Sequence, residues 1–170
     1  MLTESQTKYL QTIPADKIVF IKPFDPQAGV YAKKLIADIQ AITPEIEVFW
    51  SGALALDISG LNDIDLSILV PEKNFKKYLP SLIPILGKPT KESDMNVLWR
   101  IEKEGHHIDA YLSREDSGDI KMHKKLFEML KSDSALLDEY RRIKESANGL
   151  SFIEYQKRKY EFYNKILGLQ

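Results

Sequence analysis

The chain contains no cysteine among its 170 residues, which excludes disulfide bonds, thiolate metal sites and a cysteine nucleophile. Any bound metal must therefore be held by oxygen or imidazole ligands. The sequence also has no apolar run near the ~20 residues needed to cross a bilayer, and the segment Met1–Pro14 lacks the apolar stretch of a secretory signal. We expect no membrane partner and a cytoplasmic location.

Neither sign of charge is in excess, because 24 basic residues balance 25 acidic ones and leave a net charge of -1. Proteins that bind nucleic acid through many phosphate contacts normally carry a strong positive charge, so we do not expect a nucleic-acid partner. An anionic substrate would have to be held by a few local groups. With 44% hydrophobic residues and only 8 glycines and 8 prolines, the composition is that of a globular protein.

The pattern of the chain changes near Arg114, where mixed strand and helix patterns give way to helical ones. We expect an α/β core at residues 1–114 and a helical section at residues 115–170 that packs on it within one structural domain. Strands are predicted at 18–22, 46–51, 63–70, 87–91, 96–102 and 106–112, and helices at 27–42, 72–86, 118–131, 134–147 and 152–167. The fold class is therefore α+β, a mixed sheet with helices on one side and a helical C-terminal section.

Two of the predicted strands place acidic side chains on the face opposite their apolar side chains. In the strand at 63–70, Asp63 and Asp65 share one face and lie about 7 Å apart along the chain. In the strand at 106–112, Asp109 shares its face with His107. If the two strands are neighbours, Asp109 joins the pair.

Three carboxylates on one face repel one another unless a cation lies among them. Oxygen ligands without cysteine favour Mg²⁺ or Mn²⁺, which commonly borrow phosphate oxygens from a substrate. Such a site suits phosphoryl or nucleotidyl transfer. We therefore predict that Asp63, Asp65 and Asp109 are catalytic and hold the metal, with His107 as an accessory candidate.

A candidate phosphate-binding turn precedes the acidic strand. Ser51, Gly52 and Ala53 end one strand and open a short apolar run, where a small residue and free backbone N–H groups would admit an anion. Arg100 and Lys91 are further candidate phosphate neighbours, although a lone basic residue on a strand is more often a solvated charge.

The strings Phe49–Ala53, Asp63–Leu66 and His107–Ala110 together resemble the signature of the nucleotidyltransferase (polymerase-beta-like) superfamily. That signature is a glycine turn, an Asp-x-Asp pair and a third carboxylate on a later strand. The resemblance implies a minimal nucleotidyltransferase-like core in which Asp63 and Asp65 hold metal and Asp109 completes the site. It also implies that Ser51 and Gly52 contact the phosphates of a nucleotide.

The order of features along most of the chain resembles the GrpB-like branch of that superfamily more closely. The similarity includes Ile18–Pro26, Gly60-Leu61 and Leu136–Lys144, followed by Tyr155, Lys159 and Phe162. GrpB-like proteins usually read Gly-Ser-Thr-Ala-Val-Pro-Gly-Leu at the glycine turn, whereas this chain reads Ser-Gly-Ala-Leu-Ala-Leu from Ser51. The family has no settled reaction to carry over, so the resemblance leaves the substrate open.

Two functions follow as hypotheses. The first is a Mg²⁺-dependent nucleotidyltransferase that moves a nucleoside monophosphate from a nucleoside triphosphate (NTP) to the hydroxyl of an unidentified small molecule or protein. The alternative is a catalytically inactive nucleotide- or metal-binding module that acts as the partner of another enzyme; a phosphohydrolase is a third.

Two patterns in the last predicted helix have ordinary structural interpretations. Its aromatic residues Tyr155, Tyr160, Phe162 and Tyr163 recur at helical spacing and are expected to lie in the core. The basic run Lys157–Lys159 is expected to be a solvated surface.

Overall fold

A five-stranded mixed sheet forms the centre of the molecule, in the strand order β1-β2-β5-β4-β3. The structure is a computed structural model that describes residues 2–71, 76–93 and 96–169. The central strands β2 and β5 run parallel, and the other neighbouring pairs are antiparallel. The strands are β1 (Glu47–Ser51), β2 (Ile64–Val70), β3 (Lys91–Glu92), β4 (Val97–Lys103) and β5 (His106–Arg114).

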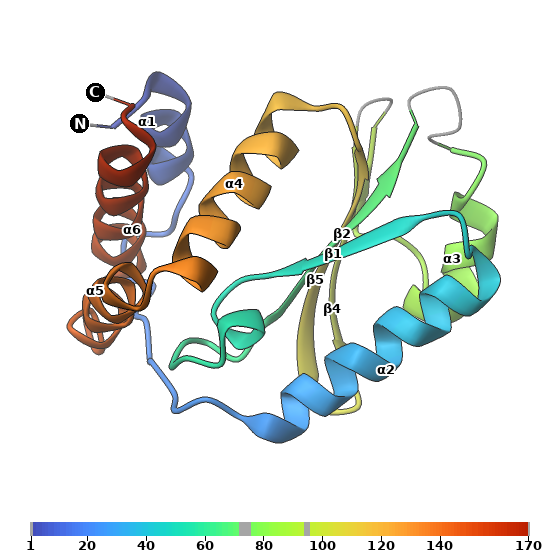
Figure 1. Cartoon of the computed structure of the whole chain (residues 1–170), viewed down its shortest axis with the longest axis horizontal. Helices are drawn as coiled ribbons and strands as arrows, with labels where there is room; N and C mark the ends of the chain where they lie inside the picture. The colour runs from blue at the N-terminus through green and yellow to red at the C-terminus, as the bar shows by residue number, and fades with distance from the viewer. Residues whose placement is uncertain (1, 72–75, 94–95, 170) are drawn as a thin grey trace.

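Two helices cover one face of this sheet and enclose the main hydrophobic core (Figure 1). They are α2 (Pro26–Ile42), which Asp25 caps at its N-terminus, and α3 (Leu79–Leu86). The apolar positions of β2 and β5 point into this core because alternate residues of a strand face opposite sides. Trp99 of β4 is fully buried there, and its indole N–H donates to the carbonyl oxygen of Gly87 at 2.9 Å.

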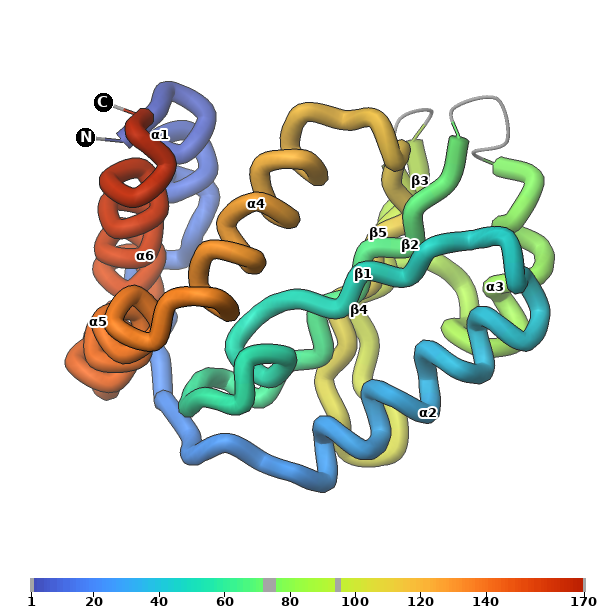
Figure 2. Tube along the Cα trace, in the orientation of Figure 1, coloured from blue at the N-terminus to red at the C-terminus, as the bar shows by residue number. Residues whose placement is uncertain are grey.

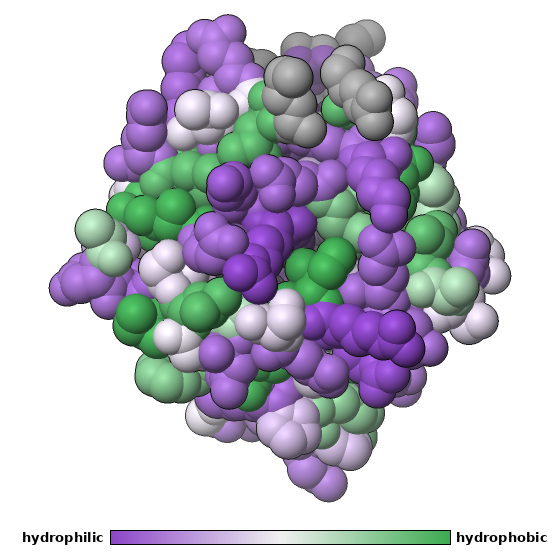
Figure 3. Space-filling view, turned by 90° about the vertical axis from the view of Figure 1, so that its left-hand side faces the viewer, coloured by the Kyte–Doolittle hydropathy of each residue, from purple (hydrophilic) through white to green (hydrophobic). Residues whose placement is uncertain are grey.

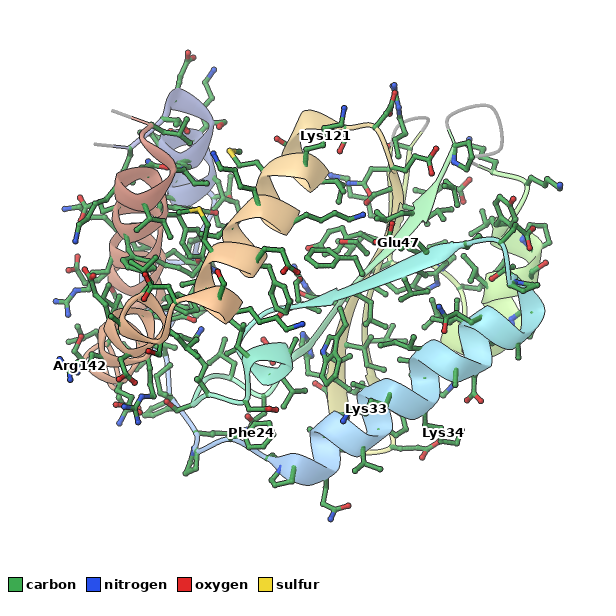
Figure 4. All side chains as sticks on the ribbon, viewed as in Figure 1. Phe24, Lys33, Lys34, Glu47, Lys121 and Arg142 are labelled. Carbon is green, nitrogen blue, oxygen red and sulfur yellow. The ribbon has the colours of Figure 1, made fainter. Side chains whose placement is uncertain are left out.

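The opposite face of the sheet looks toward the C-terminal helices (Figures 1 and 2). A short helix near the N-terminus packs with them, and Gln6 and Asn164 exchange two amide hydrogen bonds of 3.0 and 2.8 Å. A 2.7 Å ion pair joins Lys124 to Glu47, which Figure 4 shows on β1 beside α4. The outer side of this helical layer is largely hydrophilic (Figure 3). These helices are α1 (Glu4–Gln11), α4 (Gly118–Ser132), α5 (Ser134–Glu145) and α6 (Phe152–Leu167).

Three predicted elements differ from the structure. The strand predicted at 87–91 is reduced to β3, Lys91–Glu92. The segment 18–22 is not a strand, because it makes only isolated bridges, from Ile18 to Ser151 and from Lys22 to Gly60. These partners belong to two different parts of the fold, so no continuous ladder can form. The helix predicted at 72–86 is present as α3 from Leu79, whereas residues 72–75 lie outside the described residues. Within the described chain, no helix has the length and apolar character needed to span a membrane.

Candidate functional site

A single row of side chains crosses four strands of the sheet on the face that looks toward the C-terminal helices. Ser51 on β1 is paired with Asp65 on β2, Asp65 with Asp109 on β5, and Asp109 with Arg100 on β4. Neighbouring strands lie about 4.8 Å apart, so the two carboxylates stand side by side. Asp63 immediately precedes β2 and borders the same cleft.

The turn after β1 comes very close to this row. Gly52 has φ +82°, and a Cβ atom placed there would lie 2.1 Å from Oδ2 of Asp65. A larger residue would therefore collide with the carboxylate, in addition to straining the backbone. The run after Ala53 forms only one 3-10 turn, Leu54–Leu56. It is too short for the anion-binding helix N-terminus that the sequence predicted.

A cleft of about 1080 Å³ separates the row from the helices. Its walls come from β1, β2, β4, β5, the 3-10 turn, α1, α4, α5 and α6. The cleft-facing residues of α5 and α6 that matter for its chemistry are Tyr140, Lys144, Tyr155, Gln156, Lys159, Tyr160 and Tyr163.

Two lysines of this wall have no carboxylate partner among the described residues. Lys144 is only 4% exposed, and its ammonium group donates to the hydroxyl of Tyr155 at 2.7 Å and to that of Tyr140 at 3.5 Å. It also lies 4.9 and 5.2 Å from the centres of those two rings. Lys159 lies 5.8 Å from the ring centres of both Tyr155 and Tyr163.

Burial disfavours the charged form of each of these groups. Burial, together with the nearby charge of Lys159, lowers the pKa of Lys144 from its ordinary 10.5 to about 7. Burial also lowers the pKa of Lys159, while the charges of Asp65 and Asp63 oppose that change. When both are charged, the two buried ammonium groups repel each other. An anion between them would stabilise the charged form of both lysines.

The carboxylates across the cleft show the converse effect. Burial raises the pKa of Asp65 from 3.8 to about 7; Lys159 opposes this rise, and Asp63 and Asp109 add to it. Burial also raises the pKa of Asp63, although the charge of His107 counters it. In the described part of the chain, no hydrogen bond or ion pair is formed by the carboxylate of Asp65. A cation at this position would reverse these preferences.

The carboxylate of Asp109 already forms an ion pair with Arg100. The guanidinium of Arg100 donates two hydrogen bonds to its carboxylate, at 2.9 and 3.1 Å, and Nε2 of His107 lies 3.5 Å from Oδ1. His107 is itself oriented by a 2.7 Å contact between its Nδ1 and Glu102. Arg100 therefore lies in the predicted site but touches the third carboxylate.

The donor set fits a divalent cation that arrives with phosphate. Across residues 2–71, 76–93 and 96–169, no three acidic or histidine side chains are gathered closely enough to form a metal site by themselves. Asp63 and Asp65 nevertheless offer hard carboxylate oxygens, and Asp65 is unpaired. Mg²⁺ is commonly bound by one or two carboxylates together with substrate phosphates, so these two residues are suitable ligands.

One predicted site residue, Lys91, lies apart from the others, and two residues that were not predicted, Lys144 and Lys159, belong to the site. Lys91 lies on β3, two strands away from β5, and does not border the cleft, whereas Ser51, Gly52, Ala53 and Arg100 do. Its side chain is exposed at the edge of the sheet, as is usual for a lone basic residue on a strand.

The interpretation of the last helix is confirmed at its buried aromatic residues and is wrong at one lysine. Tyr155 and Phe162 are core residues and Tyr163 packs against the core, although Tyr155, Tyr160 and Tyr163 also line the cleft. Lys159 faces the cleft rather than bulk solvent. One feature of the sequence indicated the position of this lysine: Lys159 follows Tyr155 by four residues, which places both on one side of a helix.

Comparison with known proteins identifies the fold. No family model matches the chain, and neither does any curated protein sequence. The crystal structure of GrpB from Enterococcus faecalis is similar over 87% of this chain and 99% of that one, with a TM-score of 0.63 and 16% identity. Cid1, described as an RNA terminal uridylyl transferase, matches with a TM-score of 0.40 and 15% identity. The match covers 84% of this chain and 47% of the Cid1 chain.

The chain therefore has the fold of GrpB. This similarity and the observed sheet confirm the predicted fold class, α+β with a mixed sheet and a helical C-terminal section, and support the GrpB-like resemblance at the level of fold.

Proposed function

We propose that this chain transfers a nucleoside monophosphate from an NTP to a hydroxyl group of a small molecule or protein, with Mg²⁺ or Mn²⁺ as cofactor. The observation that carries the proposal is the unpaired charge on both sides of the cleft. Asp63 and Asp65 favour a cation, Lys144 and Lys159 favour an anion, and among the described residues no ion pair joins the two sets. A metal-bound triphosphate supplies both charges at once.

The roles of the residues follow from their positions. Asp63 and Asp65 would hold the cation, which when bound would neutralise phosphate charge and make the α-phosphorus more electrophilic. Lys144 and Lys159 would bind the outer phosphates, and the tyrosine hydroxyl groups at Lys144 would keep its ammonium group in place. Gly52 lets the backbone of the turn pass directly beside the carboxylate of Asp65.

One observation favours the alternative, a nucleotide-binding module without turnover. Asp109 is held by Arg100 through two hydrogen bonds, so only two of the three predicted acidic ligands are free. Transfer through the complete acidic set requires Arg100 to leave Asp109, for example to contact a phosphate. A module that only binds nucleotide has no such requirement.

Pyrophosphate release and calorimetry separate these functions. We expect ATP with Mg²⁺ to bind the wild-type chain, and labelled NTPs with a panel of hydroxyl acceptors to release pyrophosphate. Asp65→Asn keeps the side-chain shape but removes the charge, and should abolish release. Asp138→Asn, on the exposed side of α5, is the matched control and should have no effect.

Binding without pyrophosphate release would support the module instead. Failure of ATP to bind, or release that Asp65→Asn leaves unchanged, would refute the proposed site.

A further inference from the structure

A second cavity, of about 480 Å³, borders the cleft. It is open to solvent and is lined by the segment 17–22, the start of α2, the residues that lead into β2, the turn between β4 and β5, and Phe152 of α6. Leu61, Asn62 and Asp63 line both this cavity and the larger cleft. A molecule in the second cavity would therefore meet a nucleotide in the cleft at Asp63, where the cation is proposed to lie.

Two of the three acidic groups of the second cavity, Asp25 and Glu102, already have partners within the protein. Asp25 accepts a 2.9 Å hydrogen bond from the backbone N–H of Gln27 at the start of α2. Glu102 lies 2.7 Å from Nδ1 of His107. Neither carboxylate needs a ligand to compensate its charge.

The two lysines of this cavity lack such partners. Lys17 lies 3.9 Å from the centre of the Phe152 ring, and neither Lys17 nor Lys22 forms an ion pair with any described residue. Lys22 is close enough to Asp63 for its charge to lower the pKa of that carboxyl group. Two ammonium groups that line a cavity of this size, neither with an ion-pair partner among the described residues, favour a small ligand with an anionic group.

The junction between the two cavities offers an unused hydrogen-bond acceptor. Asn62 is held in the left-handed region, at φ 60°, and its amide N–H donates to the carbonyl oxygen of Pro23 at 2.9 Å. Its buried Oδ1 receives no hydrogen bond from the described residues. An unpaired buried acceptor is destabilising, so a small adjustment that admits a hydroxyl donor would be favourable.

We infer that the second cavity binds the acceptor, and that the acceptor is a small phosphate ester with a free hydroxyl group. This inference rests on the proposed function. The phosphate lies between Lys17 and Lys22, and the hydroxyl group points past Asn62 toward Asp63. The hydroxyl oxygen forms a bond to the α-phosphorus of the NTP, the bond from that phosphorus to the bridging oxygen breaks, pyrophosphate leaves, and the hydroxyl proton passes to water.

The test measures binding without nucleotide, so that it does not depend on turnover. Ribose 5-phosphate, ribose and inorganic phosphate are titrated separately into ¹⁵N-labelled full-length protein while amide chemical shifts are followed. We expect ribose 5-phosphate to shift amides in the segment 17–22, at Asn62 and in the turn between β4 and β5. Ribose and phosphate, each with half of the recognised groups, should bind at least about tenfold more weakly.

Charge-reversal variants locate the phosphate. Lys17→Glu combined with Lys22→Glu should weaken binding of ribose 5-phosphate at least about tenfold. Lys33→Glu on α2 is the matched control, because this exposed lysine (Figure 4) does not line the cavity, and binding should stay within about twofold of wild type. Unchanged thermal melting of the variants shows that they fold.

Several results would overturn the inference. They are shifts confined to the cleft around Asp65, equal binding of ribose and ribose 5-phosphate, wild-type affinity in the double variant, or no shifts at millimolar concentrations. If ATP still binds in the cleft in any of these cases, only the acceptor site is refuted, and the proposed function stands.

Discussion

Replacing Lys144 with methionine should make the protein more stable while removing nucleotide binding. Methionine has a similar length and no charge, so it can fill the same space between Tyr140 and Tyr155. Lys144 is 4% exposed and has no carboxylate partner within the described chain, so the folded protein bears the cost of a buried ammonium group.

The size of the effect follows from the pKa of Lys144. The change from 10.5 to about 7 corresponds to about 4–5 kcal/mol, at about 1.4 kcal/mol for each tenfold change in proton affinity. Methionine forfeits the two hydrogen bonds to tyrosine hydroxyl groups, which offsets about 2 kcal/mol. We therefore expect Lys144→Met to raise the free energy of unfolding by about 2 kcal/mol at pH 7.

The pH dependence gives an independent check of sign. Between pH 7 and 10.5 the unfolded chain keeps a proton on Lys144 that the folded chain has released, so Lys144 makes the wild type more stable as pH rises through this range. The advantage of Lys144→Met should therefore shrink toward pH 10.

Urea unfolding followed by circular dichroism measures both quantities, and calorimetry with ATP and Mg²⁺ measures the loss of binding. Lys131→Met, at an exposed position in the last turn of α4, is the control and should change stability by less than about 0.5 kcal/mol. If Lys144→Met is less stable than wild type at pH 7, or binds ATP equally well, the account of the lysine wall is wrong.

Three further predictions concern the acidic row. Gly52→Ala should lower the free energy of unfolding by about 1–2 kcal/mol because of its positive φ, and it should also weaken Mn²⁺ binding by displacing Asp65. Gly149→Ala is the control: it also has a positive φ, but no atom lies within 4 Å of its new Cβ, so it should show only the loss of stability. Arg100→Gln should release Asp109 and strengthen Mn²⁺ binding several-fold in paramagnetic resonance titrations, and an unchanged affinity would contradict the role of that ion pair. Because burial raises the folded pKa of Asp65 from 3.8 to about 7, the wild type should lose about 3 kcal/mol of stability between pH 4 and 7, and Asp65→Asn should flatten this part of the unfolding profile.

The elements of the sheet were accessible from the sequence because strand and helix patterns are local. Alternation in Ile64–Val70 predicted β2 and showed that Asp65 faces away from the core. The capping residue Ser151 marked the start of α6, and it accepts a 3.2 Å hydrogen bond from the N–H of Glu154. The segment 18–22 failed as a strand because β propensity does not specify whether a neighbouring strand is available.

The sequence by itself determined the acidic side chains, their shared strand face and the absence of thiolate chemistry, because these depend on residue type and on the two-residue period of a strand. Only the tertiary structure showed that Asp65 lies beside Asp109 and that Arg100 is hydrogen-bonded to Asp109. It also showed that Lys91 lies outside the cleft, whereas Lys144 and Lys159 line the wall opposite the carboxylates. These contacts join residues distant in the chain. Burial then changed their proton affinities, and burial is a property of packing that no local pattern contains.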